Sequence, residues 1–241
     1  MSLGRSIKER QKQGLFPVIS ELKIRSKKAG DLLRDRDPLG LVREMSSCPV
    51  AGISVVTESA HFGGSMDLLK KVVASVSVPV LHKDFIRDKE QIKESQRIGS
   101  SAILLIASIL NKKELEELID AARRYQIEVL LEVHTREEID KVKDMGFDLL
   151  GINNRDIKVL ETDDTGIELT EALIKHCPKR CPIISESAIG AAHDLKRVKK
   201  AGADAVLVGT AVMLADNIKD FLDQLIGVGW DGKGKDMRHN Q

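Results

Sequence analysis

Two oppositely charged side chains share one face of a short apolar stretch near the N-terminus. The run PVISEL at residues 17–22 has the composition of a buried strand, and Glu21 and Lys23 lie at its end. Side chains in a strand alternate with a period of two, so Glu21 and Lys23 point to the same side. Burying two charges is costly unless they pair or sit at an opening to water. The pair is therefore either an ordinary surface salt bridge or part of a reactive site, and these residues alone do not decide between them.

Other apolar runs also end in charged, amide or hydroxyl side chains. The residues at these ends are Thr57, Glu58, Lys83, Asp84, Ser108, Glu132, Asn153, Asn154, Arg155, Ser187, Gly209 and Thr210. Lysines and carboxylates can act as general acids and bases, which is the chemistry that such a set would offer. A single lysine at a strand end is usually structural, but a set that converges on one opening would form an active site. The fold must decide whether these ends converge.

Eight short apolar runs alternate with helical patterns along the chain. The expected strands are residues 17–22, 51–56, 78–82, 102–106, 127–131, 148–152, 182–186 and 204–208. Their near-continuous apolar composition is typical of parallel strands that helices cover. Eight such units in 241 residues favour a closed (β/α)8 barrel, the TIM barrel of the α/β class, over an open doubly wound sheet. No GxGxxG pattern follows the first run, which argues against a dinucleotide-binding sheet.

Capping signals mark the helices between these strands. Helix starts are expected at Asp37, Asp88, Asn111 and Thr135, each followed by proline or by an acidic or amide residue three positions on. Helix ends are expected at Gly99, Gly146 and Gly202. No linker interrupts residues 17–226, so we expect a single domain over residues 1–241 with its core at 16–226. The Gly/Lys-rich tail at 227–241 is expected to be flexible.

The composition argues against several classes of protein. Lys and Arg total 38 against 37 for Asp and Glu, and a net charge of +1 predicts no general affinity for nucleic acid or membrane surfaces. No apolar stretch approaches the roughly 18–20 residues that span a bilayer, and the first residues lack the apolar region of a signal peptide. Cys48, Cys177 and Cys181 are too few for a disulfide framework and fit a reducing cytoplasm. His176 beside the last two lacks a second half-site, so we expect no metal centre.

The last two units carry a candidate phosphate site. The segments SESAIG and LVGTAV end the seventh and eighth expected strands, where barrels of this type often bind phosphate. Gly209 lets the backbone approach an anion, and Thr210 begins a short helix whose free N–H groups favour negative charge. The motif is weak by itself, and its position in the eighth unit is what supports the prediction.

Seven segments together resemble one enzyme family, in the right order and spacing. PVISELKIRSKKAG, GISVVTESAHFGG, PVLHKDFI, LLEVHTREE, GINNRD, ISESAIG and AVLVGTAVM are similar to the sequences of indole-3-glycerol-phosphate synthases, (β/α)8 lyases of tryptophan biosynthesis. The similarity runs from Phe16 to Asp216. Sister barrels of the same pathway share the phosphate end but not the combination of ExK, LxKDF, LxEVH and GINNR.

The resemblance implies a carboxy-lyase that closes, decarboxylates and dehydrates 1-(2-carboxyphenylamino)-1-deoxyribulose 5-phosphate, giving indole-3-glycerol phosphate, CO2 and water. No cofactor or metal is implied, because the cationic imine formed on ring closure is itself the electron sink for loss of CO2. The family's catalytic residues match Glu21, Lys23, Lys83, Glu132, Asn153 and Ser187. Lys83 matches the general acid of ring closure. The division of the dehydration among Glu132, Lys23 and Glu21 stays open.

The resemblance also implies how the substrate is held. Asn153 would position substrate hydroxyls, and Arg155 together with Lys23 would hold the carboxylate. The phosphate grip matches Ser26, Ser187, Gly209 and Thr210, with Ala188 beside them. The apolar slot for the aromatic ring matches Phe62, Leu81, Phe85, Leu104 and Ile157.

Three features depart from the family pattern. Lys27 and Lys28 follow Ser26 where the family usually has Pro-Ser, Ala188 stands where it usually has glycine, and residues 1–16 form a shorter extension than its helical N-terminal cover. Two alternatives to the synthase are another phosphosugar barrel, such as an isomerase or aldolase-like lyase, and a non-catalytic barrel that binds a phosphorylated ligand or a partner enzyme. The resemblance implies a cytoplasmic enzyme with a small phosphorylated substrate, and it leaves open an association with other enzymes of tryptophan biosynthesis.

Overall fold

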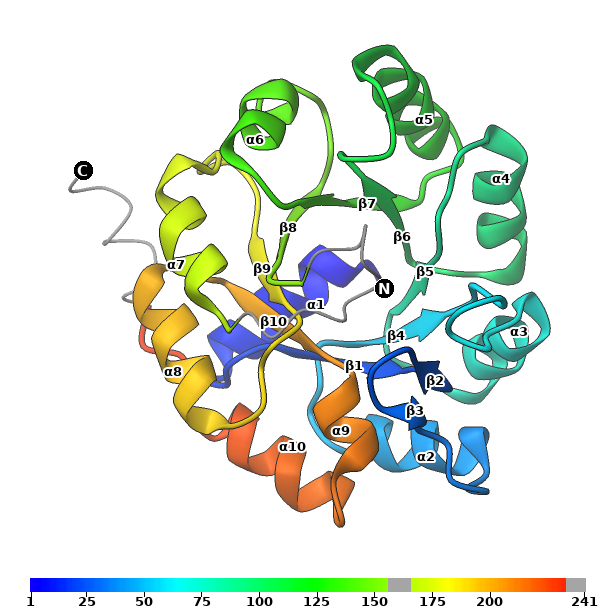
Figure 1. Cartoon of the computed structure of the whole chain (residues 1–241), viewed down its shortest axis with the longest axis vertical. Coiled ribbons are helices and arrows are strands. Elements are labelled where there is room, and N and C mark those ends of the chain that lie inside the picture. The colour runs from blue at the N-terminus through cyan, green and yellow to red at the C-terminus, as the bar shows by residue number, and fades with distance from the viewer. Residues whose placement is uncertain (156–165, 233–241) are drawn as a thin grey trace.

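Eight parallel strands close into a barrel in the computed structural model, which describes residues 1–155 and 166–232 (Figure 1). The strands are β1 (Val18–Leu22), β4 (Gly52–Val56), β5 (Val80–Lys83), β6 (Ala102–Ile106), β7 (Glu128–Val133), β8 (Leu149–Asn153), β9 (Ile183–Glu186) and β10 (Ala205–Val208). Around the barrel the order is β1-β10-β9-β8-β7-β6-β5-β4. The predicted single-domain (β/α)8 barrel is confirmed, and each strand lies within two residues of its expected bounds.

Helices surround the barrel on the outside, as Figure 1 shows. They are α2 (Pro38–Ser47), α3 (Met66–Ser75), α4 (Lys89–Ile98), α5 (Lys112–Arg124), α6 (Arg136–Val142), α7 (Glu168–Leu173) with a 3-10 turn η2 (Ile174–His176), α8 (Ala192–Ala201) and α10 (Ile218–Ile226). The four expected N-caps are confirmed, because each side chain accepts a backbone N–H of the first turn. A continuous apolar layer fills the space between strands and helices.

The expected helix ends are confirmed at two glycines and wrong at the third. Gly99 and Gly202 cap α4 and α8 in the left-handed conformation, with φ of 98° and 113°. The helix α6 instead ends at Val142, before Gly146. The guanidinium of Arg180 binds the backbone carbonyls of Lys143, Met145 and Phe147, which stabilises a turn where another helical turn would otherwise follow.

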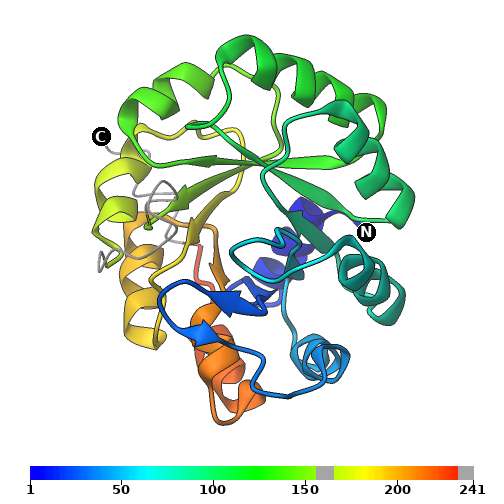
Figure 2. The ribbon, with the colours of Figure 1, turned by 45° about the vertical axis from the view of Figure 1, so that its right-hand side comes forward.

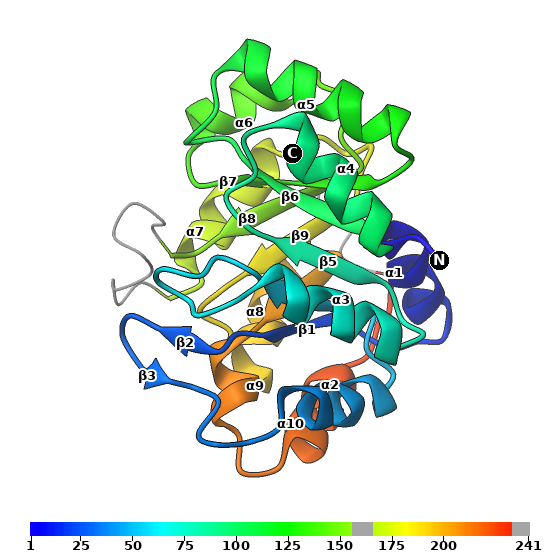
Figure 3. The same ribbon diagram turned by 90° about the vertical axis from the view of Figure 1, so that its right-hand side faces the viewer.

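A helix that was not predicted closes the amino-terminal end of the barrel. The helix α1 (Leu3–Lys12) inserts Leu3 and Ile7 into the apolar interior, where they join side chains such as Ile19 and Leu149. Figure 3 shows α1 at one end of the strands and the hairpin of β2 (Arg25–Ser26) and β3 (Gly30–Asp31) at the other. The short extension therefore seals the base of the barrel, opposite the carboxyl ends of the strands.

The carboxyl ends of the strands carry the hairpin β2–β3 after β1 and the short helix α9 (Thr210–Leu214) after β10. Figure 2 shows the hairpin standing out from the barrel on the side of α9. The predicted short helix at Thr210 is therefore confirmed.

The chain after α10 contacts the rest of the molecule as far as Asp231, within the tail that the sequence predicts to be flexible. The Trp230 ring lies 5.7 Å from that of Phe16, and the Trp230 N–H donates to the carbonyl of Gly14 at 2.8 Å. Residues 233–241 lie outside the described residues. Within the described residues, none of the helices has the length and apolarity needed to cross a membrane.

Candidate active site

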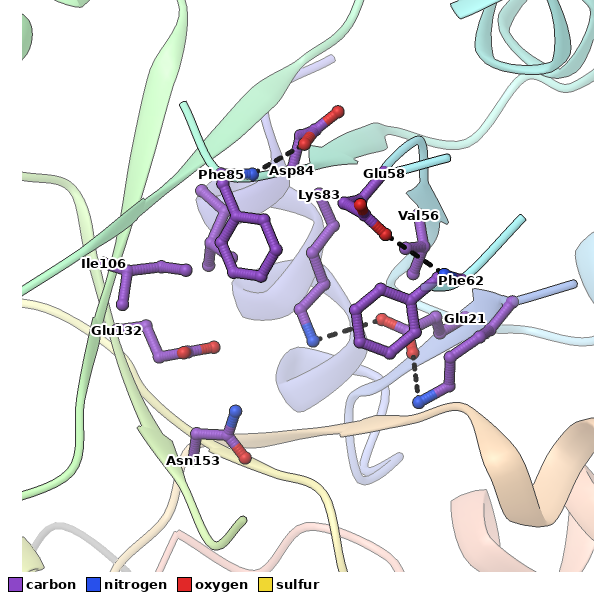
Figure 4. Close-up of a pocket in the computed structure, with 12 residues that line it drawn as sticks. Glu21, Val56, Glu58, Phe62, Lys83, Asp84, Phe85, Ile106, Glu132 and Asn153 are labelled. Carbon is purple, nitrogen blue, oxygen red and sulfur yellow. Dashed lines mark hydrogen bonds and ion pairs between the residues drawn. The ribbon is translucent and has the colours of Figure 1, made fainter. Parts of the chain in front are cut away.

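Glu21 lies at the centre of a buried charge cluster in the mouth of the barrel (Figure 4). Its two carboxylate oxygens lie 3.6 Å from Lys23 Nζ and 3.3 Å from Lys83 Nζ. The Ser54 hydroxyl donates to the same carboxylate at 3.2 Å. Glu21 and Lys23 thus point together into the mouth, and the surface salt bridge that the sequence alone allowed is excluded by their burial.

Two glycines make room for carboxylates inside the barrel. A Cβ atom at Gly209 would collide with the carboxylate of Glu21, and one at Gly151 would collide with that of Glu186. Gly209 follows β10, which pairs with β1 that carries Glu21, and Gly151 lies on β8, which pairs with β9 that carries Glu186. A substitution at Gly209 therefore displaces Glu21 as well as changing the candidate phosphate site.

Glu186 is a member of this cluster that the sequence reasoning missed. Its carboxylate is fully buried and lies 3.6 Å from Lys83 Nζ. Burial raises the pKa of Glu186 to about 8, an effect that Lys83 opposes and that the carboxylates of Glu132 and Glu21 reinforce. Strand alternation could have revealed it, because Glu186 lies two residues after the inward-facing Ile184.

Glu132 and Asn153 lie on the side of the mouth opposite Glu21 (Figure 4). Within the described residues, neither carboxylate oxygen of Glu132 accepts a hydrogen bond, although both are buried. The Asn153 side-chain oxygen accepts the backbone N–H of Arg155 at 3.0 Å, while its amide nitrogen has no partner in the described part of the chain. These polar atoms are oriented and available to a ligand.

A cavity of about 380 Å³ lies between these polar groups and an apolar wall. Of the residues expected in the aromatic slot, Phe62, Phe85 and Leu104 line it, together with Val56 and Ile106, which were not predicted. The fourth expected residue, Leu81, does not line it. Leu81 lies in the apolar interior below, and Ile157 lies outside the described residues.

Glu58 holds the loop that carries Phe62. Its carboxylate accepts the backbone N–H groups of Ala60, His61 and Phe62 at 3.0, 2.8 and 3.1 Å. Burial alone would raise the pKa of Glu58, but these hydrogen bonds lower it, so the carboxylate remains ionised. The Phe62 ring is thereby fixed with its centroid 5.7 Å from Lys23 Nζ.

A buried hydrogen-bond chain fixes the segment that follows Lys83. His82 contacts the Thr57 hydroxyl at 2.7 Å and the Ser95 hydroxyl at 2.6 Å, and Thr57 donates to Asp84. Asp84 also accepts the Phe85 backbone N–H at 2.7 Å. Burial would raise the pKa of Asp84, but the hydrogen bonds from His82 and Thr57 lower it. These hydrogen bonds hold His82 and Asp84, the residues on either side of Lys83 in the sequence, and so restrict the backbone of the lysine.

A second, wider cavity of about 1230 Å³ adjoins the first and is open to solvent. Arg155 lines this cavity, as does every residue expected to hold the phosphate: Ser26, Ser187, Ala188, Gly209 and Thr210. The helix α9 begins here with no side-chain cap on its N-terminal N–H groups. Glu21 and Lys23 line both cavities, so the charge cluster is the junction between an apolar compartment and a polar one.

Two successive residues in the second cavity have left-handed backbone conformations. Ser187 and Ala188 have φ of 63° and 58°, a region that favours glycine. This left-handed conformation explains why the resembled family usually has glycine at position 188. The present chain adopts the same kind of conformation with an alanine. Such strain concentrates at sites where the backbone must face a ligand.

Comparisons with known proteins show which proteins the chain is similar to. The family model described as "Indole-3-glycerol phosphate synthase" matches residues 1–225. The indole-3-glycerol phosphate synthase of Pyrococcus furiosus is 42% identical over 224 residues, which cover 93% of this chain and 96% of that protein. The enzyme of the same name from Thermococcus kodakarensis is 41% identical, with 94% and 97% covered, and that from Geobacillus kaustophilus is 38% identical, with 90% and 84% covered.

A solved structure with little sequence similarity shares the fold alone. A crystal structure of mandelate oxidase superimposes with a TM-score of 0.65 at 16% identity, covering 92% of this chain and 74% of that one. The barrel architecture is therefore shared well beyond the sequences that resemble this chain.

Proposed function

The chain belongs to the indole-3-glycerol phosphate synthase family, and we propose that the two joined cavities at its barrel mouth are the site of that family's reaction. The chain is a lyase of tryptophan biosynthesis that acts on a small phosphorylated substrate. It closes the ring of 1-(2-carboxyphenylamino)-1-deoxyribulose 5-phosphate and releases CO2 and water. One observation carries the site assignment: an apolar compartment and a polar one share the charged pair Glu21 and Lys23.

Lys83 is the general acid of ring closure in this proposal. Its ammonium group projects into the apolar compartment from β5, held between the carboxyl groups of Glu21 and Glu186 at 3.3 and 3.6 Å. A ketone oxygen seated there would receive the proton as the aromatic carbon attacks, and general acid catalysis of this kind contributes about 10²–10⁴-fold. The two carboxyl groups fix the position of the ammonium group before the substrate arrives.

Lys23 and Arg155 hold the substrate carboxylate until it leaves as CO2. Lys23 Nζ lies beside the Phe62 ring and lines both compartments, so it can meet a carboxylate attached to an aromatic ring in the apolar slot. Arg155 lines the polar compartment, and one of its guanidinium nitrogens has no partner within the described residues. The imine cation formed on ring closure accepts the electrons of the broken bond, so these residues only position the group.

Glu132 removes the proton in the dehydration, and the Glu21–Lys23 pair assists departure of the hydroxyl. Glu132 suits the base because its oxygens accept no hydrogen bond within the described residues. Glu21 is less suited, since Lys23, Lys83 and Ser54 already surround its carboxylate. Asn153 supports the same step, because its free amide nitrogen can hold a substrate hydroxyl beside Glu132.

The phosphate occupies the polar compartment in this proposal. The uncapped N-terminus of α9 at Thr210 offers backbone N–H groups, and the left-handed Ser187 and Ala188 expose theirs from the opposite loop. The Ser26 hydroxyl accepts the Ala29 N–H at 2.9 Å, which leaves its own proton for a phosphate oxygen. We also infer a cytoplasmic location, because three cysteines are too few for the disulfide framework of a secreted domain.

The assay of product formation tests the proposed function. The purified chain is mixed with 1-(2-carboxyphenylamino)-1-deoxyribulose 5-phosphate, and indole fluorescence is followed with and without a chelator. We expect catalytic formation of indole-3-glycerol phosphate that the chelator does not abolish. Saturable binding without product would instead support a phosphosugar-binding barrel without catalysis and would contradict the proposal.

A further inference from the structure

His134 lies between two carboxylates, one inside the barrel mouth and one on a neighbouring helix. Its Nε2 is 3.3 Å from Glu132 Oε1, and its Nδ1 is 3.4 Å from Glu138 Oε2. The His134 backbone N–H also donates to Glu138 at 2.7 Å. Because each ring nitrogen faces a carboxylate, the arrangement suits the doubly protonated, positively charged imidazolium.

The charge of the His134 ring follows from its surroundings. Burial alone would lower the pKa of His134, but the carboxylates of Glu132 and Glu138, one beside each ring nitrogen, raise it to about 10. Burial would raise the pKa of Glu138, but the neighbouring His134 ring and the His134 backbone N–H lower it. The ring and Glu138 therefore form a preformed ion pair throughout the neutral pH range.

The helix α6 fixes this pair from outside the barrel. Glu138 occupies the first turn of α6, where the Thr135 hydroxyl accepts its backbone N–H at 3.2 Å. One turn later, Lys141 Nζ binds the carbonyls of Ala107 and Leu110 at 2.5 and 3.0 Å. The helix is thus pinned to the loop after β6, and Glu138 cannot move away from His134 without disturbing that contact.

Two buried carboxyl groups of the mouth differ in their access to this cation. Burial raises the pKa of Glu186 on β9 to about 8, and the charge of His134 opposes this less than that of Lys83 does. Glu132 on β7 faces the same cluster, but it also has the imidazolium of His134 at 3.3 Å. A positive ring at this distance favours the ionised carboxylate. Of these two carboxyl groups, only Glu132 lies within ion-pair distance of the His134 ring.

We propose that His134 and Glu138 are positioning residues for Glu132, orienting its carboxylate and keeping it ionised so that it can accept a proton. The inference rests on the proposed role of Glu132 as the base of dehydration. Glu138 binds the far side of the His134 ring and fixes its position. The imidazolium therefore cannot move away from the mouth and pull the Glu132 carboxylate with it. Neither residue lines the substrate cavities, so neither acts on the substrate directly.

The pH dependence of turnover tests this proposal. His134→Asn keeps a polar side chain but removes the positive charge. We expect the acidic limb of the kcat profile to move upward by about one pH unit or more, the usual effect of losing an opposite charge at this distance. KM should change much less than kcat below the new limb. Glu138→Gln should shift the limb in the same direction by a smaller amount.

A matched control removes another histidine–carboxylate contact. His193 lies 3.7 Å from Asp194 on α8 and is exposed, so His193→Asn should leave the kcat profile unchanged. A structural role for His134 would lower the melting temperature of His134→Asn without moving the acidic limb, and that result would overturn the proposal. If His134→Asn does not fold, the profile of Glu138→Gln decides the question, and an unshifted limb there overturns it equally.

A third variant separates this proposal from the proposed function. Glu132→Gln should abolish most turnover. If it retains wild-type turnover, Glu132 is not the base, and both the proposed role and the inference fail. If Glu132→Gln is inactive while His134→Asn and Glu138→Gln keep the wild-type acidic limb, the proposed function stands and only the positioning role is wrong.

Discussion

The two ends of the barrel differ in whether their buried polar groups are hydrogen-bonded. At the amino-terminal end, Glu128 accepts the Leu3 and Gly4 N–H groups of α1, and Gln11 donates to the Asp204 carbonyl at 3.0 Å. At the carboxyl-terminal end, Glu132 and Glu186 are buried with no hydrogen-bond donor within the described residues. Hydrogen-bonded polar groups at one end thus contrast with buried carboxyl groups at the other, which have ion-pair contacts to His134 and Lys83 but no hydrogen bonds within the described residues.

This contrast indicates which end contributes stability and which carries out chemistry. Buried carboxylates without hydrogen-bond donors destabilise a fold, so their retention needs another reason. The left-handed Ser187 and Ala188 add strain at the same end. A plug of apolar side chains from α1 at the opposite end adds stability and contains no group suited to acid–base catalysis. Barrels of this kind commonly divide the two tasks in this way.

Replacing Lys83, the proposed general acid at the mouth, should have the largest effect on function. For Lys83→Ala we expect turnover to fall by about 10²–10⁴-fold, the usual contribution of a general acid. Steady-state kinetics measure this loss. Lys199 is a matched control, because it is also mostly buried and binds the Gly229 carbonyl at 2.8 Å away from the mouth. Lys199→Ala should keep its turnover, and wild-type turnover in Lys83→Ala would contradict the role of the mouth.

Truncating the plug at the base should affect stability alone. Ile7 is fully buried against the barrel interior, so Ile7→Ala should lower the free energy of unfolding by about 2–5 kcal/mol. Denaturant unfolding measures this change, and Lys8→Ala on the exposed face of α1 serves as the control. The kcat of folded Ile7→Ala should equal that of the wild type. A large loss of kcat in the folded variant would show that the two ends are not independent.

Relieving the strain at the mouth should have the smallest effect. Ala188 has φ of 58°, and Ala188→Gly removes a steric cost of about 1–2 kcal/mol that the flexibility of glycine partly offsets. We expect a small gain or no change in stability, an unchanged kcat, and a KM that is equal or lower. Chemical denaturation and steady-state kinetics measure these quantities. A tenfold loss of kcat would mean that the methyl group itself has a catalytic function.

Much of the barrel was predictable because its signals are local. The eight apolar runs and the capping residues Asp88 and Asn111 each act within a few positions of sequence, and the structure keeps them. The convergence of Glu21, Lys83, Glu132 and Asn153 followed from topology, since parallel strands bring their carboxyl ends to one opening. The aromatic slot was predictable only by resemblance.

The remaining features depend on contacts between distant residues. The helix α1 has a mostly polar sequence, and only its docking into the barrel reveals why Leu3 and Ile7 are apolar. The turn before Gly146 depends on Arg180, which follows it by more than thirty residues. Glu186 could be mistaken for a solvated strand-end residue, because nothing near it in sequence indicates the room that Gly151 provides.

The stability and turnover of Glu186→Gln, measured together across pH, test most directly the claim that the mouth retains destabilising groups for chemistry. The pKa of Glu186 rises from 4.5 to about 8 on folding, so the native carboxyl keeps its proton where the unfolded chain loses it. Wild-type stability should therefore fall between pH 4.5 and about 8, and the glutamine variant should lack this loss. We predict a stability advantage for the variant that grows with pH, together with turnover reduced by about tenfold or more, because an amide beside Lys83 can neither release a proton nor become negatively charged. A variant with wild-type turnover and a stability difference that does not change with pH would contradict the account.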